Sequence, residues 1–279
     1  MRSLLVADIG LNANGDVEIA KELMRYCQFF GVDYVKFQKR TPDKCVPEDQ
    51  KNVMRDTPWG RMTYLEYRKR VEFNLGDYVE IAVYAKSIGQ KWFASVWDED
   101  SLAMMSEFSP PFLKIPSACL TDISLLEKAK STGIPIILST GMSDFPMIES
   151  ALDILDSSVE YLLHCTSTYP CKAEEQNINC VATMKERYPF VKIGYSNHHS
   201  GIPGMIAAMG LGAEMVEFHI TLNRSFYGTD QASSIEPEGI WKICKYRDFL
   251  ELAMGDGEKK IYDSEIPIMK KLRKCNTNV

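Results

Sequence analysis

Histidine can act as a proton carrier or as a metal ligand, and this chain of 279 residues contains only four. His198 and His219 each stand at or just beyond the end of a short apolar run that has the pattern of a buried strand. If the two strands are neighbours in a parallel sheet, both imidazoles can converge on one divalent ion as neutral nitrogen ligands. The alternative is that each is a hydrogen-bonded histidine of the core or of a loop. We expect His164 to belong to the core and His199 to face a loop.

Two lysines interrupt apolar runs of the same kind. Lys36 lies within DYVKFQ and Lys114 within FLKIPS. A lysine in a buried strand is unfavourable unless it meets an anion or a carboxylate. Two cations beside a metal site predict a dianionic ligand, and structural ion pairs with Asp8 or Glu217 are the alternative.

Further polar side chains stand at the ends of these apolar runs, where a parallel sheet would bring them to one edge. They are Asp8, Gln38, Ser95, Ser117, Ser139, Thr140, His164, Thr166, Ser196 and Asn197. The run STGM at 139–142 offers hydroxyls and exposed backbone amides, which often hold phosphate. The same run is also an ordinary turn between a strand and a helix.

The elements that must position these residues alternate along the whole chain. The apolar runs that we expect to be strands are 4–10, 33–38, 91–96, 112–117, 135–140, 160–166, 191–197 and 215–221. Amphipathic segments follow them, and several of these end in a glycine that can close a helix. Eight strand–helix units in this length predict a TIM (β/α)8 barrel rather than a doubly wound sheet. In such a barrel, the C-terminal ends of the strands share one mouth, so the chemistry is expected there.

Two segments fall outside the regular spacing. Residues 39–76 are too long for a simple connection and predict a lid or binding loop, with Trp59 among the groups that suit a sugar. We expect residues 1–257 to form the barrel and residues 258–279 to form a charged tail.

Composition excludes several classes of protein. The net charge of −6 disfavours a nucleic-acid binder, which needs a clustered basic surface. No apolar run approaches membrane-spanning length, which predicts a soluble globular protein. The eight cysteines show no CxxC spacing and are expected to be reduced thiols of a cytoplasmic protein.

The chain resembles the N-acetylneuraminate (sialic acid) synthases and their pseudaminic and legionaminic acid relatives over nearly its whole length. The motifs that carry the resemblance are ADIGLNANGD (7–16), VKFQKRTP (35–42), PWGRMTYLEYRKRVEF (58–73), FASVWD (93–98), LKIPSA (113–118), LSTGMS (138–143), LLHCTSTYP (162–170), GYSNHHSG (194–201) and EFHITLNRSFYGTDQASSIEPEG (217–239). Nine motifs in the same order are far more specific than any one of them.

The resemblance implies a (β/α)8 barrel that condenses phosphoenolpyruvate with a sugar aldehyde related to N-acetylmannosamine. The product would be a nonulosonic 2-keto-3-deoxy acid, with release of phosphate. It implies that His198 and His219 bind a divalent ion, Mn²⁺ first and Mg²⁺ or Co²⁺ as alternatives. The phosphoenolpyruvate site would comprise Lys114, Ser117, Ser139, Ser167 and Ser196. The groups facing the sugar or the attacking water would be Asp8, Lys36, Tyr169 and Asp230.

The chain departs from the family pattern at several positions. Asp8 stands where the family usually has glutamate, and residues 12–15 read Asn-Ala-Asn-Gly instead of Asn-His-Asn-Gly. Ser167 replaces an asparagine, and Cys119 replaces an acid. Most members continue into a small antifreeze-like domain whose arginine reaches the sugar site of a partner subunit, whereas this sequence ends at Val279. Two interpretations stay open, a barrel-only member of the family and a truncated sequence. Whether the chain forms a homodimer also stays open.

Two other functions remain compatible with these residues. Lys114 could be the nucleophile of a Schiff-base aldolase, because a buried lysine with a depressed pKa can form an imine. A sugar-phosphate-binding barrel without catalysis is the other alternative, which Ala13 and Asp8 leave open and which the retention of both histidines and both lysines disfavours.

Overall fold

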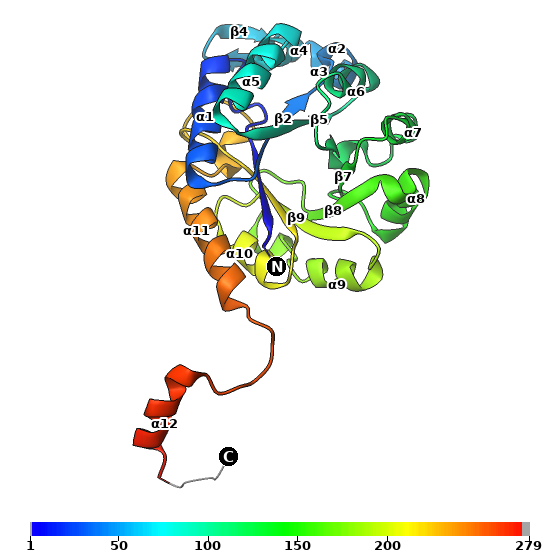
Figure 1. Cartoon of the computed structure of the whole chain (residues 1–279). Coiled ribbons are helices and arrows are strands. Elements are labelled where there is room, and N and C mark those ends of the chain that lie inside the picture. The colour runs from blue at the N-terminus through cyan, green and yellow to red at the C-terminus, as the bar shows by residue number, and fades with distance from the viewer. Residues whose placement is uncertain (1, 275–279) are drawn as a thin grey trace.

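The structure is a computed structural model that describes residues 2–274, and its centre is a closed barrel of parallel strands (Figure 1). Each barrel strand pairs with the next one along the chain, and β10 returns to pair with β1. The barrel strands are β1 (Leu4–Asp8), β2 (Tyr34–Lys39), β5 (Lys91–Val96), β6 (Leu113–Ile115), β7 (Ile136–Ser139), β8 (Val159–Cys165), β9 (Lys192–Asn197) and β10 (Met215–His219). The predicted TIM barrel is confirmed, and every predicted strand overlaps one of these.

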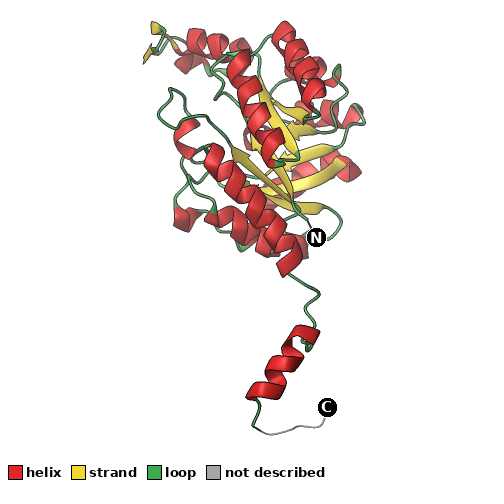
Figure 2. Cartoon of the chain, turned by 60° about the vertical axis from the view of Figure 1, so that its left-hand side comes forward, coloured by secondary structure: helices red, strands yellow, loops and turns green. Residues whose placement is uncertain are grey.

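Helices cover the outside of the barrel (Figure 2). They are α1 (Val17–Phe30), α5 (Leu75–Ile88), α6 (Glu99–Ser106), α7 (Ile123–Ser131), α8 (Phe145–Leu155), α9 (Cys180–Arg187), α10 (Pro203–Gly210) and α11 (Pro237–Ala253). Short 3-10 turns occupy Ser117–Cys119, Asp156–Ser158, Ala173–Glu175, Gln231–Ser233 and Asp263–Glu265. Local sequence sets the ends of α1: Asp16 accepts hydrogen bonds from the backbone N–H groups of Glu18 and Ile19, and Gly31 closes the helix with φ of 88°.

Side chains alternate between the inside and the outside of each barrel strand. In β10, Val216 and Phe218 pack toward the helices, whereas Met215, Glu217 and His219 point inward. The inward side chains that fill the N-terminal half of the barrel are apolar: Val6, Phe93, Phe112, Ile137, Tyr161, Leu163 and Met215. Because the inward residues nearer the C-terminal ends are polar, the barrel has a packed apolar floor and a polar mouth.

The connection between β2 and α5 is a structured insert, which we define as residues 40–74. It consists of α2 (Pro42–Cys45), α3 (Glu48–Lys51), the hairpin strands β3 (Met54–Thr57) and β4 (Gly60–Thr63), and α4 (Tyr64–Val71). Tyr67 and Val71 of α4 pack against Leu11, which follows β1. The segment expected as a lid or loop is therefore a wall with its own elements, seen at the top of Figure 1.

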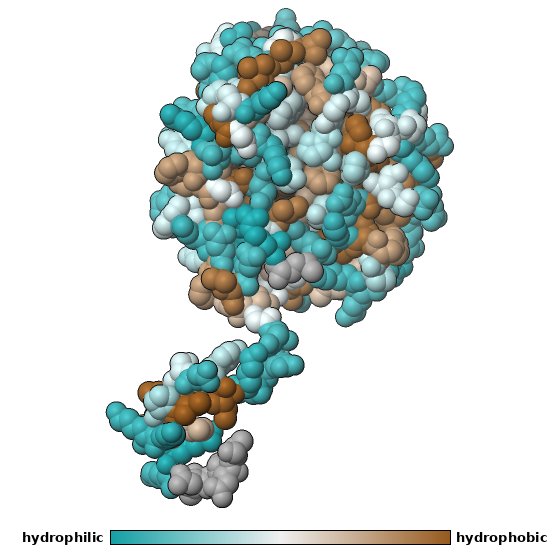
Figure 3. Space-filling view, viewed as in Figure 1, coloured by the Kyte–Doolittle hydropathy of each residue, from teal (hydrophilic) through white to brown (hydrophobic). Residues whose placement is uncertain are grey.

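Beyond α11 the chain leaves the barrel and forms a short helix, α12 (Ile266–Leu272), at a distance from the other helices (Figure 1). This helix lies within the predicted tail, of which residues 275–279 are outside the described part. Figure 3 shows apolar surface on it, and Ile268 and Leu272 are exposed there. No helix among residues 2–274 is long and apolar enough to span a membrane.

Candidate active site

A cavity of about 170 Å³, which we call the inner cavity, opens at the C-terminal end of the barrel. It is lined by Asp8, Lys36, Gln38, Ser95, Trp97, Lys114, Pro116, Ser117, Ala118, Ser139, Met142, Cys165, Ser167, Tyr169, Ser196, His198, Glu217 and His219. The structure therefore brings most of the predicted catalytic, substrate-binding and metal-binding residues together. The exceptions are Thr140, Asn197 and Asp230.

Thr140 and Asn197 do not face the inner cavity. The Thr140 hydroxyl donates a hydrogen bond to the Leu163 carbonyl at 3.0 Å, and the Asn197 amide donates to the His199 carbonyl at 2.8 Å. Each follows an inward-facing serine, Ser139 or Ser196, so strand alternation turns it into the wall. Their positions favour a structural role over the predicted contact with substrate.

Four charged side chains meet inside the barrel. Lys36 Nζ lies 2.7 Å from Asp8 Oδ2 and 3.3 Å from Glu217 Oε1, while Lys114 Nζ lies 3.4 Å from the same Glu217 oxygen. All four side chains are almost fully buried. The ion pairs that were the alternative explanation for the two lysines are thus present. Asp8 Oδ1 and Glu217 Oε2 are buried without a hydrogen-bond partner among the described residues, so each can still accept a hydrogen bond.

The two lysines differ in how well their charge is balanced. Burial opposes the charge of Lys36, but Asp8 and Glu217 outweigh it and raise the pKa of Lys36. For Lys114, burial together with the nearby Lys36 charge outweighs Glu217 and lowers the pKa. Lys114 is therefore the cation that gains most from an anionic ligand.

His198 and His219 lie side by side at the ends of β9 and β10, with ring centroids 5.5 Å apart. The Nδ1 atom of His198 is 2.7 Å from the Thr166 carbonyl oxygen, which can only accept, so Nδ1 carries the proton and Nε2 keeps its lone pair. Burial lowers the pKa of His198 to about 4, which keeps the ring neutral near pH 7. A neutral imidazole with an oriented free nitrogen is the form that binds a metal.

The surroundings of His219 also fit a divalent ion. Its Nδ1 atom is buried without a hydrogen-bond partner among the described residues, and it lies 3.5 Å from Asp8 Oδ2 and 3.8 Å from Asp230 Oδ2. Within residues 2–274, no set of three or more His, Cys, Asp or Glu side chains is arranged as metal ligands. His198 and His219 are thus two candidate nitrogen donors without a third side chain of these types arranged beside them in the described part of the chain.

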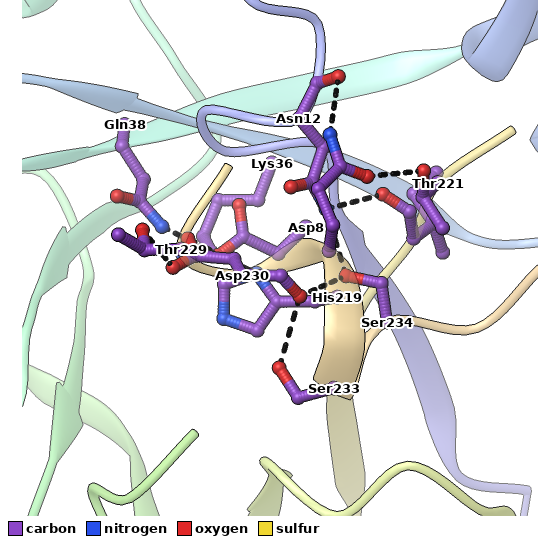
Figure 4. A network of polar contacts seen from close by, with 12 residues as sticks. Asp8, Asn12, Lys36, Gln38, His219, Thr221, Thr229, Asp230, Ser233 and Ser234 are labelled. Carbon is purple, nitrogen blue, oxygen red and sulfur yellow. Dashed lines mark hydrogen bonds and ion pairs between the residues drawn. The ribbon is translucent and has the colours of Figure 1, made fainter. Parts of the chain in front are cut away.

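Asp230 is held in place by a polar network around the loop that follows β10 (Figure 4). The hydroxyls of Ser233 and Ser234 donate to the Asp230 carbonyl at 3.0 and 2.6 Å, and Thr229 donates to the Asp230 carboxylate at 2.7 Å. Asn12 donates to Ser234 at 2.7 Å and thereby ties the loop to the segment after β1. The network fixes the Asp230 carboxylate in front of His219.

Hydroxyl groups line the side of the inner cavity nearest β7 and β8. Ser139 Oγ and Ser167 Oγ are buried without a hydrogen-bond partner among the described residues, while Ser117 Oγ accepts from the Gly141 N–H at 2.9 Å. A Cβ atom at Gly141 would lie 2.1 Å from Ser167 Oγ, so only glycine lets the backbone approach this closely. Hydroxyls and a backbone amide around a lysine suit an oxyanion such as phosphate or carboxylate.

A second cavity, the outer cavity, has a volume of about 660 Å³ and shares Gln38, Trp97, Ser167 and Tyr169 with the inner one. Its remaining lining is Leu11, Arg40, Pro42, Cys45, Val46, Pro47, Tyr64, Arg68, Thr168, Thr229 and Asp230. Much of this lining comes from the insert, so the segment expected to cover the mouth of the barrel does border the outer cavity. Trp59, however, lines neither of these two cavities and packs against Tyr67 and Tyr227 with ring centroids 6.4 and 6.3 Å away.

Sequence reasoning missed several residues of the two cavities. Glu217 was considered only as a structural partner, although it stands two residues before His219 and alternation places both on the inner face. Arg40 and Arg68 belong to the segment expected to bind sugar, but neither they nor Trp97 were singled out. Trp97 follows β5 directly and could have been found from its position, whereas a single arginine on a charged helix gives no such signal.

Three further expectations concern residues near the mouth. His164 is buried and its Nε2 lies 2.9 Å from the Gln176 carbonyl, which confirms a core histidine. His199 Nδ1 accepts from the Gly201 N–H at 3.0 Å, which confirms a loop histidine. Ala13, which departs from the family pattern, is buried in the core between barrel and helices and lines neither cavity.

Comparisons with known proteins agree with this geometry. The model of the NeuB family matches residues 23–259. N-acetylneuraminate-9-phosphate synthase of Mus musculus is 32% identical over 276 residues, which cover 97% of this chain and 76% of that protein. N,N'-diacetyllegionaminic acid synthase of Campylobacter jejuni is 32% identical over 271 residues, covering 95% and 81% of the two chains.

Solved structures lead to the same family. The sialic acid synthetase of Leptospira borgpetersenii serovar Hardjo-bovis, in complex with citrate, has a TM-score of 0.86 at 28% identity and covers 99% of this chain and 94% of its own. A truncated 3-deoxy-D-arabino-heptulosonate 7-phosphate synthase of Thermotoga maritima shares the fold alone, with a TM-score of 0.68 at 16% identity over 91% and 88% of the two chains. The chain therefore belongs to the NeuB family.

Proposed function

We propose that this chain is a synthase that condenses phosphoenolpyruvate with an open-chain sugar aldehyde to form a nonulosonic 2-keto-3-deoxy acid. The observation that carries the proposal is the pair of connected cavities, a small polar one inside the barrel that holds Lys114 and a larger one beside it. The histidine pair lies at the inner cavity, near the Asp230 carboxylate of the outer one. Two substrates of unequal size can meet there, and relatives at 32% identity are named as synthases of such acids.

In this proposal, phosphoenolpyruvate occupies the inner cavity. The Lys114 ammonium compensates its negative charge, and the buried hydroxyls of Ser139 and Ser167 donate to its oxygens. The remaining groups of the expected site, Ser117 and Ser196, also line this cavity. These interactions are electrostatic and positional, and the burial of Lys114, Ser139 and Ser196 strengthens them.

The sugar occupies the outer cavity, with its aldehyde directed toward the histidine pair. Tyr169 lies between the two cavities and contacts both histidine rings, at centroid distances of 4.2 Å to His198 and 5.9 Å to His219. Asp230, Gln38 and Ser95 offer polar groups at the same junction. Tyr169 and Asp230 therefore position the sugar, and Lys36 positions Asp8.

The reaction follows from this arrangement. The enol carbon of phosphoenolpyruvate forms a bond to the aldehyde carbon, and the aldehyde oxygen takes up a proton and becomes a hydroxyl. Water adds to the carbon that carries the phosphate, and phosphate leaves with cleavage of that carbon–oxygen bond, which generates the keto group. Burial opposes ionisation of Asp8, but Lys36 and His219 outweigh it and lower the pKa of Asp8. The ionised Asp8, whose Oδ1 has no partner among the described residues, can accept the proton of the water.

We propose that His198 and His219 hold a divalent ion. Mn²⁺ is our first choice, with Mg²⁺ and Co²⁺ as alternatives, and such an ion polarises the aldehyde oxygen of the sugar when bound. This assignment is supported by the free nitrogen of His198 and by Nδ1 of His219, which has no hydrogen-bond partner among residues 2–274.

We further propose that the enzyme works in the cytoplasm, which the free thiols of seven described cysteines support. Cys275 lies outside the described residues. A homodimer stays a proposal as well, to be checked by light scattering.

The proposed function is tested by a screen for phosphate release. The full chain is incubated with phosphoenolpyruvate, Mn²⁺ and a panel of aldoses and N-acetylated hexosamines, and the organic product is identified by mass spectrometry. We expect phosphate release that requires an acceptor sugar, together with a product that contains both carbon skeletons. Release without an acceptor, or an adduct of Lys114 trapped by borohydride, would contradict the proposal, and the adduct would favour a Schiff-base aldolase.

A further inference from the structure

We propose that Arg40 and Arg68 bind a phosphate monoester carried by the acceptor sugar at the end remote from its aldehyde. This inference rests on the proposed function and names the class of acceptor, a sugar phosphate rather than a neutral sugar. It is carried by two guanidinium groups in the wall of the outer cavity that make no ion pair with a carboxylate among the described residues.

Arg68 is a buried cation without a partner. It lies on α4 with an exposed fraction of only 6%, and it lines the outer cavity. No hydrogen bond or ion pair joins its guanidinium group to another residue among the described ones. Because the Arg68 guanidinium group lines the outer cavity, its donors are left for water or for a ligand in that cavity. Its neighbour on the same helix, Lys69, is half exposed and pairs with Asp43 at 2.7 Å. The same helix therefore also carries a cation at the surface, where water and a carboxylate stabilise the charge.

Two contacts orient the guanidinium group of Arg40, and they leave its Nη1 atom unused. Its Nη2 donates to Gln38 Oε1 at 2.7 Å, and its guanidinium plane lies over the Trp97 ring with the carbon 3.7 Å from the centroid. Its Nη1 is buried without a hydrogen-bond partner among the described residues. A guanidinium oriented in this way retains donors for a ligand in the cavity that it lines.

The two arginines repel each other. Burial and the charge of Arg68 together lower the pKa of Arg40 to about 10, although Glu72 and Asp230 act in the opposite direction. Two carboxylates nearby offset part of this charge, but among the described residues Glu72 Oε2 has no hydrogen-bond partner, and neither acid accepts a hydrogen bond from either guanidinium group. Glu72 contacts Lys39 Nζ at 3.2 Å and the Arg40 backbone N–H at 2.7 Å, and Asp230 faces His219. The outer cavity therefore has an excess of positive charge on the side of the insert.

A phosphate monoester fits this excess better than other sugar substituents do. It carries about −1.5 to −2 charges at neutral pH and three acceptor oxygens, which two guanidinium forks can share. A uronic acid offers the two guanidinium groups one negative charge and two acceptor oxygens. A neutral sugar offers them hydroxyl oxygens without a charge. Since Lys114 and the serine hydroxyls line the inner cavity, the two anionic substrates would have separate places.

The experiment compares three acceptors that differ at one end only: an N-acetylated hexosamine, its 6-phosphate and the matching uronic acid. Phosphate release from phosphoenolpyruvate gives kcat and KM for each with the full chain and Mn²⁺. We expect kcat/KM to be at least tenfold higher for the phosphorylated acceptor, mainly through KM. Arg68→Met should reduce this preference by at least tenfold, Arg68→Lys should keep part of it, and Lys69→Met should leave it as in the wild type.

Thermal unfolding separates a binding role of Arg68 from a structural one. We expect Arg68→Met to have a Tm equal to or above that of the ligand-free wild type, because it removes an unbalanced buried charge. The hexosamine 6-phosphate should raise the Tm of the wild type more than that of Arg68→Met. A clear loss of Tm in Arg68→Met, equal kcat/KM for neutral and phosphorylated acceptors, or a preference for the uronic acid would overturn the inference while the proposed function stood. Absence of phosphate release with every acceptor would overturn the proposed function, and with it the inference.

Discussion

The Lys36 ammonium lies 2.7 Å from the Asp8 carboxylate, and the two side chains are 3% and 1% exposed. They stand opposite each other on the paired strands β1 and β2, where register and inward alternation fix their contact. Glu217 adds a second carboxylate at 3.3 Å. A buried ion pair often stabilises a fold less than apolar side chains of similar volume would, so a role in ligand binding is a reason for its presence. Removing one partner should lower both the free energy of unfolding and the activity.

Lys36→Met is expected to destabilise the barrel by about 3–5 kcal/mol, because it leaves Asp8 and Glu217 as buried carboxylates with less compensation. The double variant Asp8→Asn with Lys36→Met should recover part of that loss. Urea unfolding measures both. As a matched control, Lys192→Met removes a lysine from an exposed pair with Glu160 and should change the free energy of unfolding by less than about 1 kcal/mol. Additive effects of Asp8→Asn and Lys36→Met would show that the contact is energetically unimportant.

His198→Ala and His219→Ala should each abolish binding of Mn²⁺ as measured by calorimetry, and with it the turnover. His199→Ala provides the control, since the neighbouring His199 ring makes its contact within the loop, to Gly201. Because His198 and His219 supply the whole proposed donor set of the protein, neither variant should retain more than weak affinity. Equal affinity for Mn²⁺ in all three variants would rule out the histidine pair as the metal site.

Lys114→Met should weaken binding of phosphoenolpyruvate to the metal-loaded protein roughly 10- to 100-fold, since a hydrogen bond to a charged group contributes about 1.5–3 kcal/mol. Calorimetry in the absence of sugar measures this directly. The lowered pKa of Lys114 also suits an imine-forming lysine, so borohydride is added in a parallel sample that contains all substrates. Unchanged affinity would mean that Lys114 serves the core or the sugar instead.

The fold and most of the residues that line the inner cavity could be predicted from the sequence, because two sequence patterns point to the same residues. Strand alternation and strand ends together locate Lys36, Lys114 and His219 on the inner face of the barrel. The same rule, applied too generously, also included Thr140 and Asn197, which are one residue beyond an inward position and turn into the wall.

The insert and the outer cavity were less accessible, because their structure depends on tertiary contacts. Trp59 has the chemistry of a sugar-binding residue, yet it packs against Tyr67 and against Tyr227, and Tyr227 is far from both in the sequence. Arg68 lies on a helix with charged neighbours, where an exposed arginine is the normal expectation. Only the packed structure reveals that this particular side chain is buried and faces a cavity.

The contact between Thr41 and Asp98 connects the insert to the barrel and makes the wall of the outer cavity sensitive to acid. The Thr41 backbone N–H and hydroxyl donate to the Asp98 carboxylate at 2.7 and 2.8 Å, and the Ser101 N–H donates to it at 2.9 Å. Burial alone would raise the pKa of Asp98, but these hydrogen bonds outweigh it and lower the pKa below the ordinary value of 3.8. A carboxylate with a lowered folded-state pKa stabilises the fold above its unfolded-state pKa, and the stabilisation is lost as the pH falls from there through the folded-state value.

Asp98→Asn keeps a side chain that can cap α6 but removes the charge, so it should loosen the attachment of α2 near neutral pH. Hydrogen exchange of the amides in residues 41–46 should be faster in Asp98→Asn than in the wild type at pH 6, after correction for intrinsic rates. The free energy of unfolding should also be lower in the variant at pH 6, and the difference from wild type should shrink as the pH falls below about 4, where aspartate in the unfolded chain becomes protonated. Asp153→Asn on the exposed face of α8 is the control and should show no such pH-dependent difference. If Asp98→Asn exchanged like the wild type at pH 6, the Asp98 charge would have no part in holding the wall of the outer cavity.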